Sequence, residues 1–515
     1  MKRRAFLTAV CRGSAACATL PLLRCARRTG RKPNIVFILA DDLGYGDLGC
    51  YGGRKIETPN IDALAATGKR FSQFYSGAPV CAPARCVLMT GLHTGHAYVR
   101  GNDEMRERGD VWDFAKMVED ANLEGQRPIP AETQTVGKVL QSAGYRTGIV
   151  GKWGLGGPLT EGVPNRQGFD FFYGYNCQRQ AHTYYPRHLW KNEQKVWLDN
   201  PLVAPGTKLA EGADPYDPES YASFSLDQYS PDLMFDEILD FVERNRENPF
   251  FMYWATTIPH VALQAPERWV DFYVKKFGDE EPYLGERGYF PHRHPHAAYA
   301  AMISYLDEQV GALVDKLKQL GLYEDTLIMF SSDNGPTFGG GADTAWFESA
   351  KPLSQELDRI KGSVYEGGIR VPLIASWPGR IEPESTSDRI AAFYDLMPTL
   401  CELTGAAIPE TTDGISFLPE LLGSGGAREH EFLYWEFPSY GGQQAVRLGK
   451  WKGVRRNILE GRLEIELYDL ENDIGETQNI ADRHPEIVAR IREIMEREHT
   501  PSSVPRFKMK ALGDL

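Results

Sequence analysis

The sequence predicts an α/β fold in which a large doubly wound, mixed but mainly parallel sheet is flanked by helices. Two observations lead to this prediction. Four continuous apolar runs are typical of strands buried on both faces of a parallel sheet, at 34–40, 146–151, 250–255 and 326–332. Amphipathic helical patterns separate them, at 60–71, 135–143, 231–244 and 298–320. This alternation favours parallel pairing, because each crossover between parallel strands usually contains a helix.

The C-terminal part of the chain has a different pattern. After about Gly426 come shorter alternating runs, at 432–435, 444–447, 450–454 and 463–468, and then a helical pattern at 485–497. We therefore expect a small C-terminal α+β subdomain with an antiparallel sheet and one packed helix. The predicted domains are a targeting segment at 1–32, a main domain at 33–426 and this subdomain at 427–515.

The composition is that of an acidic globular protein. The chain has 515 residues, of which 42% are hydrophobic, and a formal net charge of −13. This length can bury a large core. The acidic balance argues against a general nucleic-acid-binding protein, which needs a basic face. An anionic substrate would therefore require a local cationic pocket.

The first residues have the pattern of an export signal. Arg3 and Arg4 precede a short apolar run and then small residues, as in a twin-arginine signal. This predicts export to the periplasm or the outside of the cell; the alternative is an irregular basic tail. Lipoprotein cleavage before Cys17 or Cys25 is disfavoured by Arg24 but stays open. No later apolar run reaches the ~20 residues that a membrane span needs.

Five cysteines remain after the predicted signal: Cys50, Cys81, Cys86, Cys177 and Cys401. Their number is odd, their spacing is sparse, and no C-x-x-C pair occurs among them. The pattern excludes a disulfide framework and a paired-cysteine zinc site, so at least one of these cysteines is free.

Polar side chains follow the predicted strands at the edge where sheets of this class bind ligands. Asp41-Asp42 and Asp333-Asn334 follow two strands, and Lys152 and His260 follow the other two. The carboxylates and the amide are hard oxygen ligands, which predicts Ca²⁺ or Mg²⁺. For either pair alone, the alternative is helix-capping aspartates.

Cys81 is placed at the start of a helix, in Cys81-Ala82-Pro83-Ala84-Arg85. Pro83 fits a first helical turn, and Gly91 fits a left-handed helix end. Free N–H groups therefore point at Cys81, and Arg85 returns to the same end one turn later, which suits a tetrahedral oxyanion. The alternative is a partly buried structural cysteine.

Five segments carry a resemblance to a known family: 34–47, Cys81–Arg85, Gly151–Trp153, 332–335 and 361–372. The second and third resemble the two signatures of the type I sulfatases, in the alkaline phosphatase superfamily. The first and fourth resemble the metal-binding strand ends of that family, and the fifth resembles its segment with an active-site lysine. The resemblance runs from about residue 33 to residue 490, and it implies an enzyme that hydrolyses sulfuric esters.

The resemblance also implies a modified residue and a metal ion. Cys81 would be converted to formylglycine by a formylglycine-generating system, and its hydrated aldehyde would attack sulfur and later expel sulfate. The ligands of a calcium ion, or of magnesium, would be Asp41, Asp42, Asp333, Asn334 and residue 81.

The same resemblance assigns roles to the cationic side chains. Arg85, Lys152 and Lys361 would neutralise charge on the sulfuryl group. His260 would protonate the leaving oxygen, assisted by Lys361.

One position departs from the family pattern. The family commonly has histidine two residues after the signature lysine, where it is thought to contact formylglycine, and this chain has Gly154. The role is vacant or is filled from elsewhere, for which His182, His93 and His96 are candidates.

The irregular stretch 176–229, which is rich in aromatic residues, Pro and Gly, is predicted to shape the substrate pocket; the alternative is a surface excursion. Arg179 and His182 are the candidate substrate-binding residues. Further candidates are Tyr184, Tyr185, Arg187, Trp190 and Trp346. We expect a sulfated carbohydrate of the galactose or N-acetylgalactosamine sulfate type, or else an aryl sulfate.

Two rival functions stay open. A phosphodiesterase or phosphonate monoester hydrolase would use the same nucleophile and scaffold on phosphorus. A non-catalytic, calcium-dependent glycan-binding protein would result if Cys81 were not modified. A thiol phosphatase is excluded, because it needs a longer loop between its cysteine and arginine than the three residues between Cys81 and Arg85.

Overall fold

A computed structural model of the chain describes residues 32–515. The predicted export signal lies almost entirely outside the described residues. Residues 33–515 form one unit, and its boundary at 426 between main domain and subdomain stays a prediction. Within the described part, no helix combines the length and the apolar composition that a membrane crossing requires.

The main sheet of the described residues has eleven strands, in the order β10-β2-β9-β8-β1-β7-β3-β4-β5-β6, with β11 paired to β2. Its central strands β8 (Thr326–Ser332), β1 (Asn34–Ala40), β7 (Phe250–Ala255) and β3 (Arg146–Lys152) are parallel neighbours. They coincide with the four predicted strands, apart from one additional residue in β3. The prediction of a mixed, mainly parallel sheet is confirmed.

The remaining strands complete both sides of the sheet. The bounds are β2 (Lys69–Tyr75), β4 (Phe171–Tyr175), β5 (His188–Lys191), β6 (Gln194–Trp197), β9 (Arg370–Ser376), β10 (Ser385–Ser387) and β11 (Ala391–Ala392). Strand β9 runs antiparallel to β8 and β2, and β5 runs antiparallel to β4 and β6.

The register of the central strands brings their polar ends together. Ala40 of β1 pairs with Ser332 of β8, while Gly151 of β3 pairs with Ala255 of β7. Since Leu39 also pairs with Ala255, the four strands end at nearly the same level. The residues that follow them therefore meet at one edge of the sheet.

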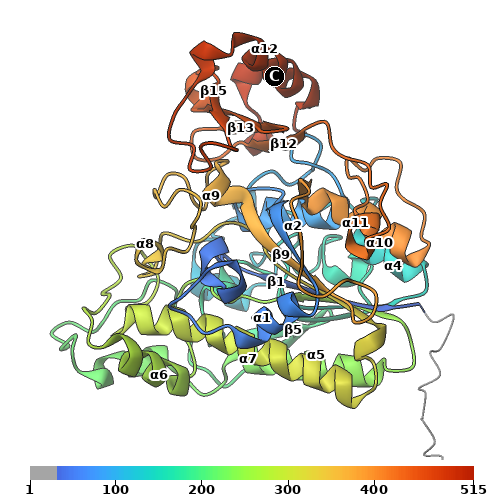
Figure 1. The fold of residues 1–515 in the computed structure, drawn as a ribbon. Helices are drawn as coiled ribbons and strands as arrows, with labels where there is room; N and C mark the ends of the chain where they lie inside the picture. Colours follow the sequence, from blue (N-terminus) through green and yellow to red (C-terminus); the bar gives the residue numbers. More distant parts are fainter. Residues whose placement is uncertain (1–31) are drawn as a thin grey trace, which may run out of the picture. The chain divides into compact units, whose positions relative to one another are not determined.

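Helices cover both faces of the sheet (Figure 1). One face carries α1 (Pro59–Ala66), α5 (Ser230–Arg244) and α7 (Pro295–Gln319), with α6 (Glu267–Phe277) packed against α7. The other carries α2 (Cys81–Thr90), α4 (Val136–Ser142), α10 (Leu396–Thr404) and α11 (Leu418–Leu422). Short helices are α3 (Phe114–Glu119), α8 (Thr344–Phe347) and α9 (Glu366–Ile369).

Alternate side chains of β1 enter two separate cores. Val36 and Ile38 pack with residues of α1, α5 and α7, whereas Phe37 and Leu39 pack with residues of α2, α4 and α10. Burial on both faces explains why the strand is continuously apolar.

The C-terminal sheet is antiparallel, as predicted, with strands β12 (Leu433–Phe437), β13 (Gln443–Leu448), β14 (Trp451–Arg456) and β15 (Glu466–Asp469) in sequence order. Helix α12 (Pro485–Glu498) packs on one face, where Ile491 and Ile494 contact Val446 and Leu467. Trp435 points the other way, into the core under α2. Figure 1 shows these elements together in red at one end of the ribbon.

The predicted helix at 60–71 is wrong in its second half. Helix α1 ends at Ala66, and Lys69–Tyr75 is strand β2. The reason lies at Gly68, where a Cβ would come within 2.2 Å of the carbonyl oxygen of Ala375 in β9. That close approach of two backbones begins the β2–β9 pairing, and Phe71 and Phe74 are buried from a strand rather than from a helix.

Candidate active site

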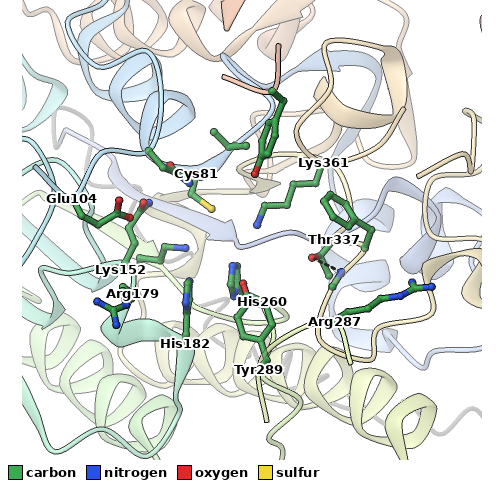
Figure 2. A pocket seen from close by; sticks show the side chains of 16 residues that line it. Cys81, Glu104, Lys152, Arg179, His182, His260, Arg287, Tyr289, Thr337 and Lys361 are labelled. Carbon is green, nitrogen blue, oxygen red and sulfur yellow. Dashed lines mark hydrogen bonds between the residues drawn. The ribbon is translucent and has the colours of Figure 1, made fainter. Parts of the chain in front are cut away.

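A cavity of about 270 Å³ opens at the carboxyl edge of the central strands. Six predicted site residues line it: Cys81, Lys152, Arg179, His182, His260 and Lys361. Figure 2 shows the Cys81 sulfur and the Lys152 and Lys361 amines directed into the space, with the two histidines opposite. Residues up to 280 positions apart in the sequence, Cys81 and Lys361, thus converge at the edge where the parallel strands end together.

Cys81 is the first residue of α2, as predicted. Val80 is extended and precedes it, and the helix ends at Gly91 with φ of 69°. The Cys81 Sγ lies 3.3 Å from Asp41 Oδ1. Burial raises the pKa of the Cys81 thiol well above its ordinary value, and the carboxylates of Asp333 and Asp41 raise it further. The surroundings therefore favour the neutral thiol over the thiolate.

Arg85 lies one turn along α2 and is fully enclosed. Its Nη2 and Nε donate to Asp333 Oδ2 at 2.8 and 3.2 Å, and its Nη1 donates to the Lys152 carbonyl at 2.6 Å. Arg85 is not among the described residues that line the cavity. It fastens the ends of β8 and β3 together, so it orients the groups that face the cavity.

Two lysines pair with the two aspartates that end β1. Lys152 Nζ lies 2.5 Å from Asp41 Oδ2, and Lys361 Nζ lies 2.5 Å from Asp42 Oδ2. Burial would raise the pKa of Asp41, but the positive charges of Lys152 and Arg85 outweigh this effect and hold the pKa below the usual range. Asp41 is therefore ionised.

The other metal-ligand candidates are joined to the same aspartates. Asn334 Nδ2 donates to Asp42 Oδ1 at 2.8 Å, and the Asp42 backbone N–H donates to Asp333 Oδ1 at 3.1 Å. Burial and the nearby Asp41 raise the pKa of Asp333 to about 7. Carboxylates held this close repel one another, and a bound cation would relieve the repulsion.

The donor set fits a hard divalent cation. Ligand atoms of Asp41, Asp42, Cys81 and His260 all lie within 4.8 Å of one another. Asn334 Oδ1 is buried and has no hydrogen-bond partner among the described residues. A buried acceptor of this kind needs a partner. Carboxylate and amide oxygens suit Ca²⁺ or Mg²⁺, so the residues present fit the predicted metal.

His260 and His182 form a stacked pair at the cavity wall, with ring centroids 4.8 Å apart and an interplanar angle of 7°. His260 Nδ1 lies 2.5 Å from the Val261 carbonyl oxygen, so Nδ1 carries a proton and Nε2 is directed toward Asp42, 3.6 Å away. Burial lowers the pKa of His260 well below its ordinary value, and Lys361 adds to this. Burial and His260 do the same to His182.

Several sequence-predicted candidates do not line this cavity: Tyr184, Tyr185, Arg187, Trp190, Trp346, His93 and His96. Their side chains have structural partners instead. Trp190 Nε1 donates to Glu124 at 2.6 Å, and Trp346 stacks on His296 with ring centroids 4.3 Å apart. Aromatic and histidine content alone does not show which way a side chain points, so a role for these residues in substrate binding or catalysis stays a prediction.

Sequence reasoning missed several residues that line the cavity, among them Asn102, Glu104, Gln178, Arg287 and Tyr289. Gln178 lies in the irregular stretch predicted to shape the pocket, but no pattern within that stretch singled it out. The others come from segments without periodicity, whose position depends on long-range packing.

The sulfatase family profile matches residues 33–406. The chain belongs to the sulfatase family. A second profile, described as N-sulphoglucosamine sulphohydrolase, C-terminal, matches residues 359–500. The sulfatase resemblance predicted from the five motifs is confirmed, and the protein is a sulfuric ester hydrolase.

Curated sulfatases align with this chain over most of its length. Human arylsulfatase A is 33% identical over 90% of this chain and 87% of its own. N-acetylgalactosamine-6-sulfatase of Canis lupus familiaris is 30% identical over 82% of this chain and 71% of its own. Among solved structures, Ps i-CgsB in complex with k-i-k-neocarrahexaose is 27% identical, with a TM-score of 0.71 over 91% of this chain and 94% of that chain.

Proposed function

We propose that this sulfatase releases sulfate from a sulfated carbohydrate, using formylglycine made from Cys81 and a calcium ion, with magnesium as an alternative. One observation carries the proposal. Cys81 faces a cavity between two lysines, beside two aspartates and an amide oxygen that lacks a partner among residues 32–515. This combines a modifiable residue, a cation site and two positive charges around one point.

Each side chain of the site has a proposed role that follows from its position. Formylglycine would supply the attacking hydroxyl group, and calcium would polarise the sulfate ester. Lys152 and Lys361 face the cavity and neutralise charge on the sulfuryl oxygens. Lys361 would stabilise the leaving oxygen, and His260 would do so once Nε2 is protonated. Arg85 holds Asp333 in position from below.

The cavity wall supports a carbohydrate substrate. Arg179 is fixed, because it donates to the Val111 carbonyl at 2.5 Å and lies over the Trp112 ring at 4.8 Å. Glu104 and Arg287 place an acceptor and a cation on opposite sides of the space (Figure 2). Such a wall suits hydroxyl groups on one side and a second anionic group on the other.

The relatives favour the same substrate class. One acts on N-acetylgalactosamine 6-sulfate by its name, and one structure contains a neocarrahexaose. We therefore propose a galactose or N-acetylgalactosamine sulfate, with aryl sulfates as simple substrates. The twin-arginine pattern and the need for formylglycine add two further proposals, export and a formylglycine-generating partner.

Two measurements test the proposal. Mass spectrometry of the peptide containing residue 81 should show an aldehyde in place of the thiol in active protein. Turnover of 4-nitrophenyl sulfate and of defined sulfated saccharides is then compared with phosphate diesters and phosphonate monoesters. A large preference for phosphorus would contradict the proposed substrate class, and full activity with an intact thiol would contradict formylglycine.

A further inference from the structure

Gln178 carries a buried hydrogen-bond donor that has no partner in the described part of the chain. The residue is 4% exposed and lines the cavity together with Cys81 and Lys152. Its side-chain Nε2 makes no hydrogen bond to any described residue. Its backbone is fixed, because the Gln178 N–H donates to Gln126 Oε1 at 2.9 Å. A buried donor at a cavity wall lowers the stability of the fold unless a ligand accepts a hydrogen bond from it.

The side chain of Gln178 lies directly over Gly154. A Cβ at residue 154 would come within 2.7 Å of Gln178 Nε2 and within 2.9 Å of its Cδ and Cγ. Gly154 also has φ of 81°, which disfavours other residues. Only glycine leaves room for this amide, so Gly154 and Gln178 share one space beside the end of β3.

We infer that Gln178 Nε2 donates a hydrogen bond to a sulfuryl oxygen of the substrate. The inference rests on the proposed function and deepens it. The amide nitrogen can only donate, so its partner must be an acceptor, and the two lysine amines that line the same cavity select an anion. A sulfate ester offers such acceptors. The amide adds a directed donor there without a titrating proton.

In this role, the Gln178 amide takes the place of the histidine that the family commonly has at the position of Gly154. The side chain that would project from residue 154 is absent, and the Gln178 amide fills its space from another segment. Because an amide does not titrate near neutral pH, the contribution of Gln178 is expected to be independent of pH.

The first experiment separates hydrogen bonding from space filling. Gln178→Ala is expected to lower kcat/KM for 4-nitrophenyl sulfate about ten- to hundredfold, since a hydrogen bond to a charged group is lost. Gln178→Glu keeps the shape but presents a carboxylate to the sulfate, so it should be at least as damaging. Retention of kcat/KM within threefold by both variants would overturn the inference.

Gln180 offers a matched control two residues away. It is a buried amide that does not line the cavity, and its Nε2 donates to the His188 carbonyl at 3.0 Å. Gln180→Leu is expected to lower the melting temperature while kcat/KM stays near wild type. Equal losses of kcat/KM in the two positions would assign Gln178 a merely structural role.

A double-mutant cycle tests the shared space. Gly154→His alone should lose activity, because its side chain collides with Gln178. In the background Gln178→Ala the space is open, and histidine tolerates positive φ better than most residues. The double variant should therefore exceed Gly154→His by at least about tenfold in kcat/KM. If the fold-loss of kcat/KM in the double variant equals the product of the losses in the two single variants, the inference is contradicted.

A binding measurement keeps this inference separate from the proposed function. Inorganic sulfate is titrated calorimetrically into Cys81→Ala protein, with and without Gln178→Ala. About tenfold weaker sulfate binding in the double variant supports the inference even if turnover of sulfate esters fails. Unchanged sulfate affinity overturns it, whereas activity of Cys81→Ala itself would overturn only the proposed mechanism.

Discussion

In the described part of the chain, two clusters bring imidazole nitrogens and carboxylate oxygens within 4.8 Å of one another. The first is the cavity cluster of Asp41, Asp42, Cys81 and His260. The second consists of His93, His96 and Asp413, which Glu498 of α12 joins through His93. We call the second the clasp, because it links the segment after α2, the Asp413 loop and α12.

The clasp completes its own hydrogen bonds, and the cavity cluster does not. His96 Nδ1 lies 2.9 Å from Asp413 Oδ1, and His93 Nε2 lies 3.3 Å from Glu498 Oε2. His93 Nδ1 accepts from the Gly95 N–H at 3.1 Å, so the ring proton is on Nε2, where it occupies the lone pair that a metal would need. Beside the cavity cluster, by contrast, Asn334 Oδ1 has no hydrogen-bond partner among the described residues. Both clusters contain ligand-type residues, so the buried acceptor without a partner is what distinguishes the cavity cluster from the clasp.

Loss of Cys81, the proposed source of the nucleophile, should have the largest effect. Cys81→Ala is expected to lower kcat for sulfate esters roughly 10⁴-fold or more, because no other group in the cavity replaces it. Cys86→Ala, five positions further along α2 and buried in the core, is the control: it should cost stability but keep kcat. Unchanged turnover of Cys81→Ala would contradict the mechanism.

Removal of the metal ion should have the second-largest effect on turnover. Chelation with EGTA or EDTA is expected to lower kcat about a hundredfold or more, reversed by Ca²⁺ or Mg²⁺. Added metal should also raise the melting temperature, since saturation at a hundred times Kd stabilises by about 2.7 kcal/mol. Asn334→Ala should weaken this shift.

The clasp provides the comparison for that experiment. His96→Gln should leave the metal-dependent shift in melting temperature unchanged, because the clasp does not depend on a cation. A loss of the shift in His96→Gln, with retention in Asn334→Ala, would reverse the assignment of the two clusters.

The cavity cluster was largely predictable from sequence and the clasp was not. Asp41 and Asp333 follow apolar runs, and parallel strands must end together, so their convergence follows from the strand pattern alone. Lys361 lies on a loop, so only its resemblance to a family segment indicated it. His93 and His96 were candidates for the vacant role at Gly154, but their partners come from segments about 320 and 400 residues away.

Gln178 shows the same limit within the site. Its importance depends on the space above Gly154, and that space exists because two distant segments pack closely. Similarly, α1 ends at Ala66 because the backbone of β9 approaches Gly68 closely, two residues further on. Local pattern gives elements and strand ends, whereas contacts between distant segments decide which polar side chains remain unsatisfied.

Breaking the clasp should affect stability rather than turnover. Asp413 contacts His96 Nδ1 at 2.9 Å and accepts a hydrogen bond from the backbone N–H of His93 at 2.9 Å. Asp413→Asn should weaken both contacts. We expect a loss of about 1–2 kcal/mol in the free energy of unfolding, measured by urea denaturation, with kcat near wild type. A large fall in kcat at unchanged stability would place the clasp in catalysis.

The smallest expected effect is the pH dependence of the clasp. A hydrogen bond from His93 lowers the pKa of Glu498 to about 2, assisted by Arg497. Because the folded pKa lies below the unfolded value of 4.5, the stabilisation is present above pH 4.5 and is lost as the pH falls toward 2. Since the carboxylate is partly exposed, we expect about 1 kcal/mol.

Urea denaturation from pH 7 down to the lowest pH at which the protein folds measures this contribution. Glu498→Gln should be less stable than wild type at pH 7, and the deficit should shrink as the pH falls below 4.5. Glu496→Gln, an exposed position on the same helix, should show no such trend. A deficit that stays constant with pH would mean that Glu498 contributes through packing, and that the clasp holds α12 without its charge.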